Sequence, residues 1–232
     1  MEYPLEPDKN QLAANLESIR ERMDLACSRS GRPSGSVRLV AVTKTHPAST
    51  IQALIDLGHR DFGENRVQEI VEKAPLLHGE FTLHMIGSLQ TNKVAPALQH
   101  VGWIQSIDRE RLIAAIESRS TGDKKFKALV EVNTSGEASK SGCLPAECRR
   151  LCERTAASGA LEFCGLMTIG PLGATEKGIR ESFALLRRLG EECRDLAPRC
   201  ELSMGMSDDF TVAIEEGSTM IRVGTALVGS RC

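Results

Sequence analysis

The stretch Leu39-Val-Ala-Val-Thr-Lys44 decides the fold, because it is a largely apolar run that ends abruptly in a lysine. A continuous apolar run of this length predicts a strand buried on both faces, as in a parallel sheet. Pro47 follows shortly after and suits the first turn of a helix. Lys44 therefore lies where a buried strand opens into a loop, which in an α/β barrel is the functional end. The alternative is a lysine whose stem follows the strand end and whose ammonium simply reaches solvent.

Beyond this strand, segments with strand character alternate with helical segments along the chain. The predicted strands are 37–43, 60–62, 81–86, 103–106, 127–132, 161–169, 201–204 and 220–223. The predicted helices between them are 48–57, 67–73, 90–99, 108–118 with Asp108 as N-cap, 145–159, 176–196 and 208–216. Eight strands alternating with helices predict a single (β/α)8 TIM barrel of the α/β class. A doubly wound open sheet is the alternative.

One amphipathic helix precedes the first strand. Residues 8–30 carry apolar side chains at helical spacing, and Gly31 follows as a stop signal. We expect this extra N-terminal helix (about 8–30) and the barrel (about 37–229) to form a single domain over residues 1–232, because no linker separates them.

Composition and charge exclude several classes of partner. The net charge of -2 and the aromatic content of 3% favour neither nucleic acid nor an anionic membrane as partner. No stretch approaches the roughly 18 consecutive apolar residues of a membrane span. The acidic N-terminus lacks the basic start and apolar core of a signal peptide, so we expect a cytoplasmic protein.

The cysteines do not follow a metal-binding or disulfide pattern. The chain has 8 cysteines, and none of them forms a C-x-x-C pair. Cys148 and Cys152 are four residues apart on a predicted helix, but no histidine is near them in sequence. We therefore expect reduced, scattered thiols and no metal site.

Polar residues follow the predicted strands, and those after the seventh and eighth suggest a phosphate site. Gly224-Thr225 offers close backbone approach and a hydroxyl, and Arg222 lies just ahead of it. Phosphate sites in such barrels often use the loops after strands seven and eight. Ser207 is ambiguous, because it also suits the N-cap of the next helix. Asp208 and Asp209 would repel a dianion, which favours Gly224-Thr225 as the main cradle.

Together these features suit pyridoxal 5'-phosphate. Only a primary amine such as that of Lys44 forms a Schiff base with the aldehyde of this cofactor. Arg222 stays protonated, so as a donor to the pyridine nitrogen it would keep that nitrogen unprotonated. A ring in that state is a poor electron sink. A Schiff-base aldolase acting on a phosphorylated sugar is compatible with the same residues.

Seven motifs strengthen this interpretation. They are Leu39-Val-Ala-Val-Thr-Lys44, Phe62-Gly-Glu-Asn-Arg-Val-Gln-Glu69, His84-Met-Ile-Gly-Ser-Leu-Gln-Thr-Asn-Lys93, Ser139-Lys-Ser-Gly142, Gly165-Leu-Met-Thr168, Leu202-Ser-Met-Gly-Met-Ser-Asp-Asp209 and Gly217-Ser-Thr-Met-Ile-Arg-Val-Gly-Thr225. With these motifs in this order, the sequence resembles the pyridoxal phosphate homeostasis protein family. The barrel of that family is similar to the N-terminal domain of alanine racemase, a fold type III barrel.

The resemblance implies a role for each candidate site residue. Lys44 would carry the cofactor and Arg222 would face the pyridine nitrogen. The phosphate would be held by Ser207, Gly224 and Thr225, and the pocket would be lined by Asn65, His84, Met204 and Ser203. His84 lies inside a predicted strand, so the alternative is a core histidine whose ring nitrogens are hydrogen-bonded within the protein. The family usually has tyrosine at the position of Arg66 and proline or histidine at that of Ser88, and these departures leave both loops less defined.

Two functions remain to be distinguished. One is a non-catalytic carrier that buffers pyridoxal phosphate and hands it by transient contact to apo-enzymes. The other is an amino-acid racemase, which needs an acid or base on each face of the α-carbon. In alanine racemase a tyrosine of a second domain serves one face. Here the single tyrosine is Tyr3, and the chain ends at Cys232 just after the eighth strand. We therefore expect a carrier with no catalytic residues, and a monomer.

Overall fold

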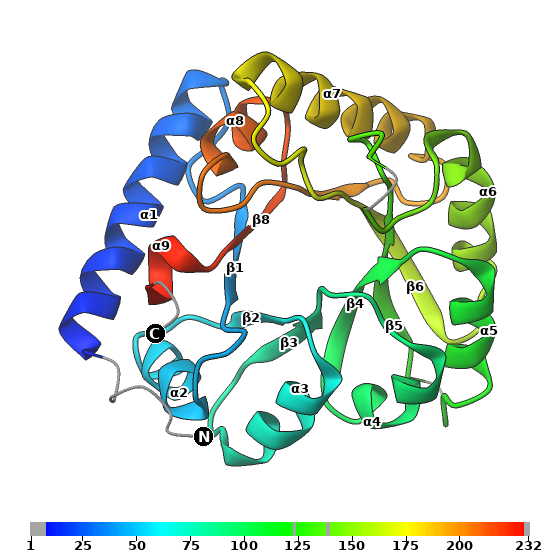
Figure 1. Ribbon diagram of the computed structural model, residues 1–232, viewed down its shortest axis with the longest axis horizontal. Helices are drawn as coiled ribbons and strands as arrows, with labels where there is room; N and C mark the ends of the chain where they lie inside the picture. The colour runs from blue at the N-terminus through cyan, green and yellow to red at the C-terminus, as the bar shows by residue number, and fades with distance from the viewer. Residues whose placement is uncertain (1–7, 123, 138–139, 230–232) are drawn as a thin grey trace.

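The computed structural model describes residues 8–122, 124–137 and 140–229. It has a closed barrel of eight parallel strands with helices around it (Figure 1). The TIM barrel predicted from the alternating pattern is therefore confirmed, and the open doubly wound sheet is wrong. Tyr3, Ser139 and Cys232, which entered the sequence-based interpretation, lie outside the described residues.

The strands follow one another around the barrel in chain order. They are β1 (Arg38–Val42), β2 (Asp61–Glu64), β3 (Thr82–Met85), β4 (Val101–Ile107), β5 (Phe126–Glu131), β6 (Leu161–Met167), β7 (Glu201–Ser203) and β8 (Met220–Val223). The barrel closes between β1 and β8, where Val40 pairs with Arg222 and Ala41 pairs with Val223. This register places the loop that begins at Lys44 beside the loop that begins at Gly224.

The helices cover the outside of the barrel, as Figure 1 shows. They are α1 (Lys9–Arg29), α2 (Ala48–Asp56), α3 (Val67–Lys73), α4 (Val94–Leu98), α5 (Glu110–Glu117), α6 (Pro145–Ala156), α7 (Glu176–Glu192), α8 (Phe210–Glu215) and α9 (Thr225–Val228), with 3-10 turns at Ala74–Leu76 and Thr91–Lys93. The extra helix α1 packs on α8 and α9. Asp8 caps its N-terminus by accepting hydrogen bonds from the amides of Asn10 and Gln11.

Two predicted helix starts differ from the structure. The helix predicted over 90–99 is a 3-10 turn followed by the short helix α4. Pro96 explains this difference, because deep inside a longer helix it would remove a backbone donor and clash with a carbonyl, whereas in the first turn it is tolerated. Asp108 does not cap α5: Arg109 is the N-cap residue and provides no side-chain cap. Asp108 instead pairs with the guanidinium of Arg109.

Apolar side chains form two separate cores. The larger one lies between the barrel wall and the helices. The smaller one fills the barrel interior and contains Val40, Trp103, Leu129, Met167 and Met220. Since side chains alternate along a strand, residues in phase with Val40 and Leu129 point inward. This alternation decides which polar residues can reach the barrel mouth.

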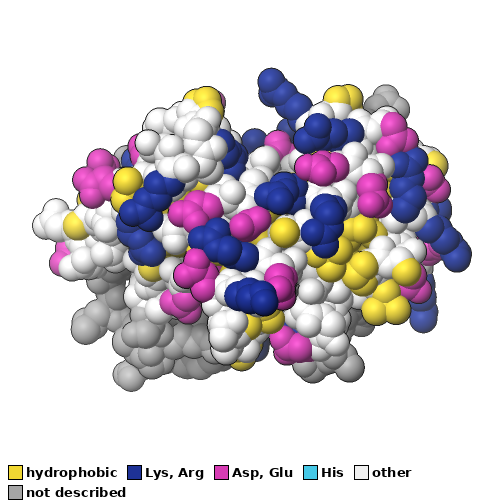
Figure 2. Space-filling model, turned by 90° about the horizontal axis from the view of Figure 1, so that it is seen from above, with side chains coloured by type: hydrophobic (Ala, Val, Ile, Leu, Met, Phe, Trp, Pro, Cys, Tyr) yellow, Lys and Arg dark blue, Asp and Glu magenta, His cyan; other side chains and the backbone are white. Residues whose placement is uncertain are grey.

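The surface carries both signs of charge. On the face shown in Figure 2, lysine and arginine side chains are interspersed with aspartate and glutamate. Among the described residues, no helix combines the length and the apolar character that crossing a bilayer demands.

Candidate functional site

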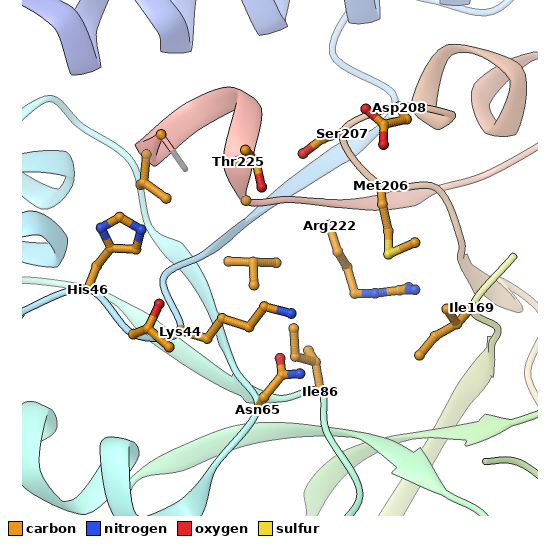
Figure 3. Close-up of a pocket in the computed structure, with 15 residues that line it drawn as sticks. Lys44, His46, Asn65, Ile86, Ile169, Met206, Ser207, Asp208, Arg222 and Thr225 are labelled. Carbon is orange, nitrogen blue, oxygen red and sulfur yellow. The ribbon is translucent and has the colours of Figure 1, made fainter. Parts of the chain in front are cut away.

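A cavity of about 410 Å³ lies at the carboxyl ends of the strands, where β1 and β8 open into their loops. Five of its lining side chains carry groups that suit an amine-reactive, phosphorylated ligand: one amine, one guanidinium, one amide and two hydroxyls. The lining residues that provide them are Lys44, Arg222, Asn65, Ser207 and Thr225. Figure 3 shows Lys44 and Arg222 extending into the cavity from β1 and β8, with Asn65 beside the lysine.

The loop that carries Lys44 is held in an unusual backbone conformation. Thr45 has a φ of 66°, the only positive value among the described residues other than glycine. A β-branched residue in this region is strained. Its amide donates a hydrogen bond of 2.7 Å to the carboxylate of Glu69, which stabilises the turn directly after Lys44.

Behind this turn lies a buried ion cluster, which we define as Thr43, Glu64, Glu69 and Lys73. The Lys73 ammonium contacts the Glu64 carboxylate at 2.9 Å and the Glu69 carboxylate at 2.7 Å. It also donates to the carbonyl of Thr43 at 3.1 Å, and the Thr43 hydroxyl donates to Glu64 at 2.7 Å. Burial raises the pKa of Glu64, while the charge of Lys73 opposes that shift. The cluster therefore fixes the residues on either side of Lys44.

Arg222 is buried and oriented by hydrogen bonds. Its guanidinium donates to the Ser203 hydroxyl at 2.6 Å and to the carbonyl of Thr168 at 2.7 Å. Burial lowers its pKa to about 10, against the opposing influence of Glu131 and Asp209. Arg222 thus remains a cation at neutral pH. Two of its five N–H groups make these two bonds, and the side chain also lines the cavity.

The third wall of the cavity is formed by the β7 and β8 loops. Gly224 is the N-cap of α9 and Thr225 is its first residue. The Ser207 hydroxyl accepts a hydrogen bond of 3.3 Å from the amide of Ala226, so it ties the two loops together and does not cap α8. In the β7 loop, Gly205 has a φ of +97°, and a Cβ there would lie 2.6 Å from that of Ala213. Only glycine allows this loop to approach α8 so closely.

Asn65 faces the cavity from the end of β2. Its side-chain oxygen is buried and has no hydrogen-bond partner within the described parts of the chain. The backbone beneath it packs against Gly87, where a Cβ would lie 2.4 Å from the carbonyl oxygen of Asn65. A buried acceptor without a partner is costly unless a ligand or water satisfies it.

Three candidates from the sequence do not line the cavity: His84, Ser203 and Met204. Ser203 and Met204 are fully buried. Ser203 contacts Arg222 and so acts on the cavity only through that guanidinium. Of the two aspartates expected near the phosphate loop, Asp208 lines the cavity. The lining also includes residues that the strand-end pattern did not single out, namely Val42, Thr45, His46, Ile86, Ile169, Met206, Val228 and Gly229.

His84 lies at the far end of a hydrogen-bond chain inside the barrel. The Ser203 hydroxyl donates to the side-chain oxygen Oε1 of Gln105 at 2.7 Å, and the side-chain Nε2 of Gln105 donates to Nδ1 of His84 at 2.8 Å. Nε2 of His84 then donates to Asp61 at 3.0 Å. Burial lowers the pKa of His84, and this pattern fits a neutral ring. The chain from Asp61 to Arg222 is a satisfied core network, which was the alternative interpretation of His84.

Glu131 is a buried carboxyl that the sequence pattern did not single out. It ends β5 in phase with Leu129, so it points into the barrel, and it is 3% exposed. Burial, together with the charge of Asp108, raises its pKa to about 7, and Arg222 opposes the shift. The signal in the sequence is a glutamate at an inward position of an otherwise apolar strand.

The stability of the protein should therefore depend on pH through Glu131. The pKa of Glu131 in the folded state is above the ordinary value of 4.5. The contribution of this carboxyl to the free energy of unfolding is therefore complete below about pH 4.5 and is lost as the pH rises through about 7. The free energy of unfolding of the wild type should fall between pH 5 and pH 8, and in Glu131→Gln this fall should be smaller by roughly 2 kcal/mol. Urea denaturation at both pH values measures the free energy of unfolding, and Glu162→Gln, at an exposed position, is the control. An unchanged pH dependence in Glu131→Gln would contradict this assignment.

Comparison with known proteins places the chain in a family. Residues 8–232 match the family "Alanine racemase, N-terminal domain". The pyridoxal phosphate homeostasis protein of Pseudomonas aeruginosa is 40% identical over 223 residues, which are 95% of this chain and 96% of that protein. The homologue from Escherichia coli, of the same name, is 37% identical over 233 residues, covering 96% of this chain and 97% of its own.

Solved structures agree with this relationship. PipY of Synechococcus elongatus, solved with PLP bound, has a TM-score of 0.75 and 39% identity, and the match covers 91% of this chain and all of PipY (100%). Alanine racemase from Corynebacterium glutamicum shares the fold, with a TM-score of 0.70 and 17% identity over 97% of this chain and 62% of the racemase. The motif-based resemblance is therefore confirmed: this chain belongs to the pyridoxal phosphate homeostasis protein family, within the wider family of alanine racemase N-terminal domains.

Proposed function

We propose that this protein binds pyridoxal 5'-phosphate in the cavity at the barrel mouth, holds it on Lys44, and buffers and delivers it without catalysing a reaction. The observation that supports the proposal is that Lys44 and Arg222 extend into the same cavity, which Ser207 and Thr225 also line. The name of the relatives and the PLP bound to PipY support the choice of ligand.

Each group of the site has a separate task in this proposal. The cofactor, when bound, supplies an aldehyde that condenses with a primary amine. Lys44 provides that amine, and the strained turn after it keeps the amine at the cavity. Arg222 donates a hydrogen bond to the ring nitrogen. The hydroxyls of Ser207 and Thr225, with the backbone at Gly224, bind the phosphate.

The residues present fit this ligand. The unpartnered oxygen of Asn65 is an acceptor that a hydroxyl on the ring can satisfy. A volume of about 410 Å³ lies at the small end of the range for small-molecule sites. In Figure 3 the carboxylate of Asp208 lies beyond Ser207 as seen from Lys44, which limits its repulsion of a phosphate.

A carrier is favoured over a racemase by the proton-transfer groups of the cavity. Racemisation needs a second acid or base opposite the lysine. The titratable side chains in the described lining, besides Lys44 and Arg222, are His46 and Asp208. The His46 ring lies on the backbone side of Lys44, away from its ammonium (Figure 3). The arginine at the ring nitrogen further disfavours carbanion chemistry, because it keeps that nitrogen unprotonated.

Incubation with single enantiomers of amino acids distinguishes the two functions. A carrier loaded with cofactor leaves each enantiomer unchanged, as chiral chromatography can measure. Racemisation that depends on Lys44 would favour the enzyme and overturn the carrier proposal.

The phosphate wall predicts a preference between two forms of the ligand. We expect Thr225→Val to weaken binding of pyridoxal phosphate by roughly tenfold, which corresponds to the loss of one hydrogen bond to a charged group. Binding of pyridoxal, which lacks the phosphate, should change little. Absorbance titration of both ligands measures this, with Thr219→Val outside the cavity as control. Equal losses for both ligands would contradict the assignment of Thr225 to the phosphate.

We further propose that the protein acts in the cytoplasm as a monomer and passes the cofactor to apo-enzymes by transient contact. Light scattering tests the first point, because a stable dimer would overturn it. Stopped-flow activation of an apo-enzyme tests the second. Direct transfer predicts a rate that rises with the concentration of the apo-enzyme, whereas release to solvent predicts a constant rate.

A further inference from the structure

Three cysteine thiols meet between α6 and α7, away from the cavity. Cys148 and Cys152 are one turn apart on α6, and Cys193 is the C-cap of α7. Their sulfur atoms all lie within 4.8 Å of one another, and those of Cys148 and Cys152 are 3.9 Å apart. All three residues are at most 1% exposed. We call Cys148, Cys152 and Cys193 the thiol cluster.

A fourth thiol adjoins the cluster. Cys143 precedes α6 and is held in place by backbone hydrogen bonds. Its amide donates to the backbone carbonyl of Glu131 at 2.9 Å, and its carbonyl accepts from the amide of Asn133 at 2.9 Å. Its thiol interacts with that of Cys148 and raises the pKa of Cys148. Cys143 is thus a neighbour of Cys148, while the group whose sulfur atoms all lie within 4.8 Å of one another is the thiol cluster itself.

The spacing of these sulfur atoms matches a known coordination geometry. Zinc binds thiolate sulfur at about 2.3 Å in a tetrahedron, which sets neighbouring sulfurs about 3.8 Å apart. The separation of 3.9 Å between Cys148 and Cys152 is already close to that value. We propose that the thiol cluster is a structural binding site for a thiolate-preferring divalent cation, with zinc as the fitting ion, and that three thiolates leave the fourth position of the tetrahedron to a further ligand such as the neighbouring Cys143.

The surroundings suit a structural ion, because all three thiols are shielded from bulk water. Binding forms metal–sulfur bonds and releases the thiol protons to solvent, so no oxidant or reductant is needed.

Cys143 is reached from the protein surface. Cys143 lines a surface cavity of about 260 Å³ between α5 and α6. The same cavity is lined by the carboxylates of Asp108, Glu110 and Glu147 and by Arg109 and Arg150. Asp108 and Glu110 are paired there with Arg109 and Arg150, and Cys143 is the thiol in the lining.

The direct test is metal content and spectroscopy on the whole protein. Protein purified under reducing conditions and supplied with zinc should retain one equivalent per chain after gel filtration, as elemental analysis measures. Replacement by Co²⁺ should give the intense near-ultraviolet absorption of thiolate-to-cobalt charge transfer and the visible bands of a tetrahedral site. Wild-type protein that retains no zinc and shows no such absorption would overturn the proposal, whatever any variant does.

Variants assign the ligands. Cys148→Ala and Cys193→Ala should each lose the bound zinc and the cobalt absorption, while Cys27→Ala, also buried but on α1, should keep both. Zinc should raise the midpoint temperature of thermal unfolding of wild type and Cys27→Ala, and it should leave that of Cys148→Ala and Cys193→Ala unchanged. Undiminished zinc and cobalt absorption in folded Cys148→Ala would contradict the site. A wild type that forms a disulfide between Cys148 and Cys152 under these reducing conditions, in place of binding zinc, would also contradict it.

Discussion

Replacing Lys44 with alanine should abolish covalent retention of pyridoxal phosphate. Wild-type protein mixed with the cofactor and then treated with borohydride should carry one stable label per chain, located on the peptide that contains Lys44. The Lys44→Ala protein should carry none, because the other polar groups of the lining are a guanidinium, an amide, hydroxyls, an imidazole and a carboxylate. None of these condenses with an aldehyde as a primary amine does. Intact-mass measurement after denaturation separates the two results.

Two further variants make this test specific. Lys44→Arg keeps the positive charge but cannot form the bond, so it should also lose the label. Lys93→Ala removes an amine outside the cavity and should retain it. The same label on Lys44→Ala as on wild type would show that another amine carries the cofactor, and the proposed function would then lose its central residue.

Replacing Lys73 with methionine should destabilise the protein by about 3–5 kcal/mol, the usual cost of breaking a buried ion pair from one side. Glu64 is fully buried and its Oε1 contacts the Lys73 ammonium at 2.9 Å. Its other oxygen has no hydrogen-bond partner in the described parts of the chain. Methionine would fill the space of the lysine stem but leave this carboxylate uncompensated. The midpoint of urea denaturation measures the loss.

The pH dependence of the variant identifies the cause. Burial already raises the pKa of Glu64, and without Lys73 it should rise further. A raised folded-state pKa means that stability is lost as the pH increases, so the deficit of Lys73→Met should be smaller at pH 5 than at pH 8. Adding Glu64→Gln should recover part of the loss. Lys177→Met removes an exposed lysine and should cost at most about 0.5 kcal/mol. A deficit in Lys73→Met as small as in this control, or one that is independent of pH, would exclude the buried pair as the cause.

The sequence by itself determined the barrel and much of the candidate cavity. Strand and helix periodicity are local properties, and eight alternating repeats have few ways to bury their apolar faces. The carboxyl ends of parallel strands all meet at one mouth, so residues directly after strands are brought together whatever the details of packing. This explains why Lys44, Asn65, Ser207, Arg222, Gly224 and Thr225 could be named in advance and why all of them line one cavity.

Only the tertiary structure decided which way the remaining side chains point and which distant groups they meet. Ser203 and His84 are polar residues near the same mouth in sequence, yet each is bonded into the barrel interior. Lys73 closes a charge cluster with Glu64 across a helix and a strand. Cys193 joins Cys148 and Cys152 from another helix, which sequence spacing could not reveal. In each case the decisive quantity is a distance between elements, set by side-chain packing and burial, and local sequence patterns do not encode it.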